Sequence, residues 1–168
     1  MKSRSKALII GLALILSVTL FTGCGKKSTP DGVWQITSSK DNQYNTNSDS
    51  SYLDIRDDGQ FVSYVIIRSD TGSTELTCIY ETGTWTLDGE TLTLNFKSVY
   101  TYNPDTKEWS GGDIGEGYSA AGKVTVNGTA MSFTGKNSDG GSFDDTMTLI
   151  GNLPDIYDAE GLNQTMSK

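Results

Sequence analysis

Apolar and polar residues alternate along most of the chain after residue 31. The motif Thr91-Leu92-Thr93-Leu94-Asn95-Phe96 alternates without a fault, and the same period of two recurs around Trp85, Val124 and Met131. This alternation is typical of antiparallel strands with one face in the core and one in water. It predicts strands at residues 33–38, 51–57, 60–69, 73–81, 83–87, 91–100, 122–127, 129–135 and 142–150.

Turn dipeptides separate most of these segments. Glycine adopts positive φ at low cost, so these dipeptides predict tight hairpins. They are Asp58-Gly59, Thr71-Gly72, Asp88-Gly89, Asn127-Gly128 and Gly140-Gly141. Eight or nine strands in this order predict an all-β fold, an antiparallel up-and-down β-barrel, with a β-sandwich as the alternative. The only helix we expect is a short turn around residues 155–160.

Two polar segments interrupt the pattern, at residues 39–50 and 101–121, and both are interpreted as loops. Four aromatic residues lie in or beside the second one: Tyr100, Tyr102, Trp109 and Tyr118. Loops often carry recognition residues on a rigid scaffold, so these rings are candidates for ligand binding, by stacking on a glycan or anchoring a partner protein. The alternative is that they fold the loop back onto the barrel.

The N-terminal segment has the features of a secretory signal. Lys2, Arg4 and Lys6 precede residues 7–21, an apolar run of 15 residues, which is shorter than the roughly 20 needed to span a bilayer. The run ends in Leu20-Phe21-Thr22-Gly23-Cys24, which resembles the bacterial lipobox. The resemblance implies that Cys24 carries acyl chains, palmitate among them, and that residues 1–23 are cleaved off.

This interpretation divides the chain into a signal peptide (1–23), a lipidated tether (24–30), a barrel domain (31–150) and a C-terminal tail (151–168). It predicts a protein held by the lipid on Cys24 at the extracytoplasmic face of the cell membrane. Without residues 1–23 the chain keeps 10 basic and 21 acidic residues, a net charge of about −11. Such a surface repels phosphates and argues against nucleic acid binding.

Candidate chemistry is sparse. The chain contains no histidine, which removes the commonest general base and metal ligand. Asp144 and Asp145 are adjacent, so on a strand they face opposite sides and form no acid/base pair by themselves. Cys78 alternates with apolar neighbours and is predicted to be a buried, inert thiol. No cofactor or metal motif is present, and no catalytic residue is assigned.

Short motifs carry a resemblance to bacterial lipoproteins with a lipocalin-like domain. These are Gly32-Val33-Trp34, Asp58-Gly59-Gln60-Phe61 and Gly83-Thr84-Trp85. The resemblance implies that Trp34 opens the first strand and plugs the closed end of a small barrel, with Trp85 as a second structural aromatic. Lipocalins also pack a late arginine on that tryptophan, whereas no arginine follows Arg68 here and only Lys123 or Lys136 could replace it.

Three functions remain open at this stage. The first is a non-catalytic surface module that binds a glycan or protein through the 101–121 segment. The second is a carrier of a small apolar ligand, although bulky inward residues such as Trp85, Leu94 and Phe133 predict a filled barrel. The third is a carboxylate-based glycosidase, which needs two carboxyl groups about 5–10 Å apart in a cleft.

Overall fold

The computed structural model describes residues 29–39, 51–68 and 76–168. The predicted signal peptide (residues 1–23), the predicted lipid site Cys24, most of the predicted tether and the predicted Thr71-Gly72 turn lie outside these residues. So does the 39–50 segment, except for Ser39, which ends the first strand. Among the described residues, no helix is both long and apolar enough to cross a membrane.

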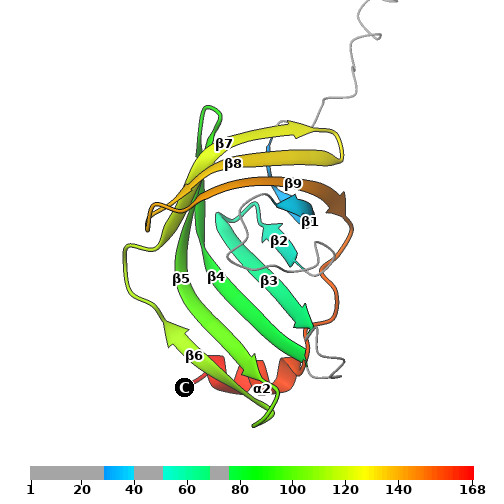
Figure 1. The fold of residues 1–168 in the computed structure, drawn as a ribbon, viewed down its shortest axis with the longest axis vertical. Coiled ribbons are helices and arrows are strands. Elements are labelled where there is room, and N and C mark those ends of the chain that lie inside the picture. Colours follow the sequence, from blue (N-terminus) through cyan, green and yellow to red (C-terminus); the bar gives the residue numbers. More distant parts are fainter. Residues whose placement is uncertain (1–28, 40–50, 69–75) are drawn as a thin grey trace, which may run out of the picture.

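The described residues form nine antiparallel strands and one helix (Figure 1). The strands are β1 (Gly32–Ser39), β2 (Ser51–Ile55), β3 (Gln60–Arg68), β4 (Leu76–Asp88), β5 (Thr91–Asn103), β6 (Glu108–Asp113), β7 (Ser119–Asn127), β8 (Ala130–Asn137) and β9 (Ser142–Ile150). The helix is α2 (Ala159–Met166). Strands β4 and β5 pair with each other and close the sheet into an eight-stranded barrel, with β6 added beside β5. The fold is therefore the predicted barrel and not a sandwich.

The two ends of the barrel differ. Tight hairpins join β2 to β3, β4 to β5 and β7 to β8 at the end where β1 begins, which we call the closed end. Gly59 and Gly128 have φ values of 82° and 64° in two of these hairpins, a conformation that glycine adopts without strain. The opposite end, where β1 finishes and β9 begins, is called the open end.

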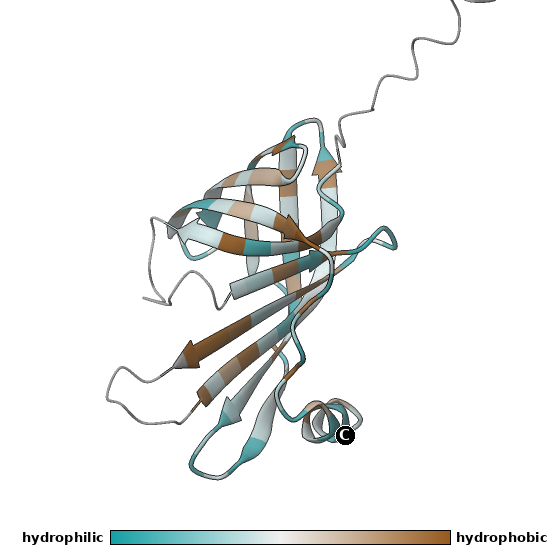
Figure 2. Cartoon of the chain, turned by 90° about the vertical axis from the view of Figure 1, so that its right-hand side faces the viewer, coloured by the Kyte–Doolittle hydropathy of each residue, from teal (hydrophilic) through white to brown (hydrophobic). Residues whose placement is uncertain are grey.

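The barrel interior is apolar toward the closed end. Buried apolar residues alternate with more exposed polar ones along strands such as β8 and the first half of β5. Figure 2 shows hydrophobic and hydrophilic residues as bands along the strands. The buried core consists of Trp34, Leu53, Ile55, Phe61, Leu92, Leu94, Ala120, Val124, Met131, Phe133 and Met147. Gly83 is part of this packing, because a Cβ there would lie 2.6 Å from the Phe61 ring and 2.1 Å from the Asn95 carbonyl oxygen.

A β-bulge in β5 changes which side chains face inward. Phe96 pairs with Gly83 and Ser98 pairs with Thr82, so Lys97 is an extra residue without an opposite partner in β4. Even-numbered residues before the bulge, such as Leu94, face the barrel interior. Even-numbered residues after it face outward, because one added residue reverses the alternation.

The outward face beyond the bulge has its own core, which we call the outer cluster. Its buried members are Val62, Tyr64, Cys78, Tyr80, Tyr100, Tyr102, Trp109 and Leu162. The C-terminal segment covers this cluster: the Trp109 Nε1 donates a hydrogen bond to the Asp158 carbonyl oxygen at 3.2 Å, and the Tyr157 N–H donates to the Tyr64 hydroxyl at 3.0 Å. Helix α2 lies against β6 (Figure 1).

Several predicted boundaries are wrong. Residues 73–81 and 83–87 were predicted as two strands, but residues 76–88 form the single strand β4. Residues 101–121 were predicted as a loop, but they contain the end of β5, all of β6 and the start of β7. The helix at 159–166 begins near the end of the turn expected at 155–160 and is longer than that turn.

Candidate functional site

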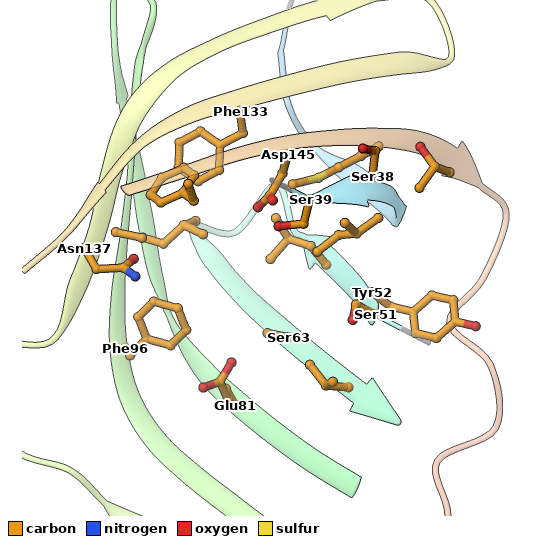
Figure 3. A pocket seen from close by; sticks show the side chains of 18 of the residues that line it. Ser38, Ser39, Ser51, Tyr52, Ser63, Glu81, Phe96, Phe133, Asn137 and Asp145 are labelled. Atoms are coloured by element: carbon orange, nitrogen blue, oxygen red, sulfur yellow. The ribbon is translucent and has the colours of Figure 1, made fainter. Parts of the chain in front are cut away.

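The open half of the barrel contains a cavity of about 520 Å³ (Figure 3). Pockets that hold small molecules are typically about 300–1,000 Å³. Nineteen residues from eight strands and the β6–β7 connection line it: Ile36, Thr37, Ser38, Ser39, Ser51, Tyr52, Leu53, Ser63, Val65, Glu81, Leu94, Phe96, Tyr118, Ala120, Phe133, Asn137, Phe143, Asp145 and Met147. The expectation of a filled interior is therefore wrong for this half of the barrel. Bulky residues fill the closed end, and serines replace them toward the open end.

One wall of the cavity carries a half-buried glutamate, Glu81. Glu81 follows the inward alternation of β4 and lies directly opposite Ser63 of β3 and Val99 of β5. Burial raises the pKa of the Glu81 carboxyl, and a hydrogen bond with Ser63 offsets part of that rise. In Figure 3 the Glu81 side chain points into the cavity.

A second carboxyl in the cavity belongs to Asp145 of β9, which is half-buried. Its pKa is raised mainly by burial and further by the neighbouring Asp144, whereas a hydrogen bond with Ser39 acts in the opposite direction. The Asp145 Oδ1 atom is buried and has no hydrogen-bond partner among the described residues. Asp144 faces outward, where the Thr134 hydroxyl donates to it at 2.9 Å. The two adjacent aspartates thus face opposite sides, as predicted.

The raised pKa of Glu81 gives a testable stability effect. A carboxyl that holds its proton more tightly in the folded chain than in the unfolded chain makes folding less favourable as pH rises. We expect Glu81→Gln to raise the melting temperature at pH 7.5 and to change it little at pH 4. The difference should develop as pH rises from the ordinary glutamate pKa of 4.5 through the raised value.

Thermal unfolding followed by circular dichroism at several pH values measures this effect. Glu116→Gln is the matched control, because Glu116 is an exposed glutamate outside the cavity. A melting temperature of Glu81→Gln equal to or below that of the parent chain at pH 7.5 would contradict the expected cost of burying this carboxylate.

Three of the four candidate binding aromatics do not lie on the surface. Tyr100, Tyr102 and Trp109 are only 7%, 4% and 6% exposed and belong to the outer cluster. The expectation that these rings are exposed in a loop is therefore wrong. The arrangement agrees with the alternative, in which they fold the segment back on the barrel. Tyr118 is different, because it is 38% exposed and lines the cavity.

Of the three residues predicted to be structural, two are completely buried and one is partly buried. Trp34 is completely buried near the closed end, and its Nε1 donates to the Pro30 carbonyl oxygen at 2.6 Å. Trp85 is partly buried against the same core, and its Nε1 donates to the Arg56 carbonyl oxygen at 2.7 Å.

Cys78 is completely buried, and the Tyr64 hydroxyl donates to its sulfur at 3.6 Å. Lys123 pairs with the exposed Glu90 and so does not replace the missing arginine at Trp34.

Sequence reasoning missed the polar residues of the cavity. Glu81, Asp145 and Ser63 occupy inward positions of strands, where alternation alone predicts apolar side chains. Their signal is a polar residue in the inward register, as at Ser63 between Phe61 and Val65. Within the described part of the chain, no three His, Cys, Asp or Glu side chains are grouped so that they could hold a metal ion.

Comparison with known proteins gives one match. A family model described as a lipocalin-like domain matches residues 31–114, which is half of the chain and spans β1 to β6. No curated protein and no solved structure matches. Strands β7 to β9 lie beyond the matched residues, and in the structure they complete the same barrel. The match and the closed antiparallel barrel together establish that this chain belongs to the family of lipocalin-like domains.

Proposed function

We propose that this chain is a lipid-anchored, non-catalytic binding protein that carries a small ligand in the open half of its barrel. The observation that carries the proposal is the cavity of about 520 Å³ above a tightly packed closed end. Family membership supports a binding or carrier role. The surface-recognition alternative is less well supported, because three of its four aromatic residues are buried.

The cavity suits a ligand with both apolar and polar parts. Leu53, Leu94 and Met147 offer apolar surface, and Ser38, Ser39 and Ser51 offer hydroxyl groups. Sites of this kind commonly combine an apolar lining with a few polar groups that orient the ligand.

Binding is tested with three probes that share a naphthalene ring: 1-naphthaleneethylamine, 1-naphthaleneethanol and 1-naphthaleneacetate. Titration calorimetry uses the full chain in phosphatidylcholine nanodiscs, with empty discs as the blank. We expect at least one probe to bind.

Asn137→Trp should weaken binding of that probe at least 10-fold, because Asn137 lines the cavity and a tryptophan there would fill its mouth. Lys136→Trp is the control, because Lys136 is exposed on the other face of the same strand. If none of the probes binds, or if Asn137→Trp binds the probe as tightly as Lys136→Trp does, the carrier proposal fails.

The proposed anchor rests on the lipobox-like segment that ends at Cys24. We expect mass spectrometry of the membrane-extracted chain to find an N-terminal Cys24 bearing diacylglyceryl. Cys24→Ser should remove the lipid and leave the signal uncleaved, because the thiol is the attachment point. Two acyl chains are enough for stable membrane anchoring. An unmodified thiol on a secreted or cytosolic product would contradict the anchor without touching the carrier proposal.

A glycosidase is the second candidate, because Glu81 and Asp145 line one cavity. Such enzymes need two carboxyl groups flanking the scissile bond. The carrier proposal predicts no turnover of aryl glycosides above the blank. Turnover that disappears in both Glu81→Gln and Asp145→Asn would establish the enzyme instead.

A further inference from the structure

The walls of the barrel cavity carry acidic groups but no basic ones. Glu81 and Asp145 line it, whereas none of its 19 described lining residues is a lysine or an arginine. We propose that the cavity selects an organic cation, a ligand with a protonated amine attached to an apolar body. This proposal rests on the carrier function above and specifies the chemical class of its ligand.

The position of the two carboxyl groups favours one ligand held between them. Glu81 projects from β4 and Asp145 from β9, and β3, β2 and β1 separate these strands in the barrel. Figure 3 shows the two side chains entering the same space from different walls. A cationic group in this space would face both carboxylates, and their separation on the barrel wall keeps them from neutralising each other through a shared proton.

The Asp145 carboxyl has an unused acceptor. Its Oδ1 is buried without a hydrogen-bond partner among the described residues, although Ser39 bonds to the same carboxyl group. A buried acceptor without a donor is costly, and the great majority of such atoms are paired in folded proteins. An ammonium group carries three donors and no acceptor, so it matches this atom, whereas an anionic ligand would be repelled.

Burial makes both carboxyl groups costly in the empty protein. The pKa of each is raised chiefly by desolvation, which penalises the charged form. A bound cation would reverse part of this penalty, because an opposite charge nearby favours ionisation. Retaining two such groups at inward positions, where apolar residues would pack without this cost, is typical of a binding site that exchanges stability for function.

The rest of the lining fits the other features of such a ligand. Phe96, Phe133 and Phe143 present aromatic rings to the cavity. Aromatic faces attract cations, and this attraction is strongest where water is excluded. Leu94 and Met147 lie on the apolar side, where the body of the ligand would pack.

The three naphthalene probes separate this inference from the carrier function, because they differ only in the head group. At pH 7.5 we expect the amine to bind at least 10-fold more tightly than the alcohol, and the carboxylate to bind most weakly. Glu81→Gln and Asp145→Asn should each remove most of the preference for the amine, measured as the ratio of the dissociation constants of the alcohol and the amine. Asp144→Asn is the matched control, since it removes a neighbouring carboxyl that faces outward.

Affinity for the amine should also depend on pH. Lowering the pH from 7.5 to 4 should weaken binding of the amine several-fold relative to the alcohol, because carboxyl groups whose pKa values are raised gain protons over this range. Glu81 is faced by Ser63 and Val99 from the adjacent strands, and Asp145 lies next to Asp144. The other titratable groups among the described lining residues are Tyr52 and Tyr118. The amine itself stays protonated throughout this range.

The possible outcomes are distinct. If the alcohol or the carboxylate binds as tightly as the amine, the carrier function stands and the cation preference is wrong. If Asp144→Asn reduces the preference as much as Asp145→Asn does, a general surface charge is responsible and the inference is again wrong. If no probe binds at all, both proposals fail together.

Discussion

Replacing Trp34 with alanine is expected to lower the free energy of unfolding by about 3–5 kcal/mol, the range typical of large aromatic deletions in a core. Trp34 is completely buried and packs in the buried core of the barrel at the closed end. Its loss leaves a void there and removes the hydrogen bond from Nε1 to the Pro30 carbonyl oxygen. Urea unfolding followed by far-ultraviolet circular dichroism measures the change.

Two companion variants make this result specific. Trp34→Phe keeps much of the volume and should cost clearly less than Trp34→Ala. Thr125→Ala, at an exposed position of β7, should stay within about 0.5 kcal/mol of the parent chain. An unfolding free energy for Trp34→Ala within that same margin would show that the closed end does not depend on this plug.

Substitution of Leu162 by alanine should cost about 2–5 kcal/mol, although this residue lies far along the chain from the strands it covers. Leu162 is only 2% exposed and is the one buried side chain that α2 contributes to the outer cluster. Deleting residues 151–168 should cost at least as much, because Leu153 and Ile156 also pack against the cluster. Trp109 would then lose its hydrogen bond to Asp158 as well.

Fluorescence reports this change directly, because Trp109 becomes exposed when the segment leaves. A red shift in emission, absent in a Trp109→Phe background, is the expected signature of the deletion. Asn163→Ala is the control, since Asn163 is exposed on the same helix. A deletion with an unchanged urea midpoint would mean that the tail lies on the barrel without stabilising it.

The barrel itself was predictable from the sequence because its signals are local. Alternation over strands such as residues 91–96 and glycine turns such as Asn127-Gly128 specify antiparallel hairpins, and enough of them close a sheet. The Gly32-Val33-Trp34 motif also identified the buried plug at the closed end. These features depend on residues close together in the chain.

The missed features depend on contacts between distant residues. Strand β6 has a single apolar residue, Trp109, and its burial comes from α2, some 50 residues later. The bulge at Lys97 leaves no mark in the alternation of residue types, because Tyr100 and Tyr102 continue the even-numbered series on the opposite face. The cavity was missed because the prediction of a filled interior considered only bulky inward residues such as Trp85 and Phe133, and not the polar Glu81 and Asp145 in the same register.

The direction of β1 has a consequence for the proposed carrier function. This strand begins at Gly32, beside the plugged end, and finishes at Ser39, which lines the cavity. An anchor on Cys24, as proposed, would therefore hold the plugged end nearest the bilayer. The mouth of the cavity would then face away from the lipid, and a carried ligand would enter from the surrounding fluid and not from the membrane.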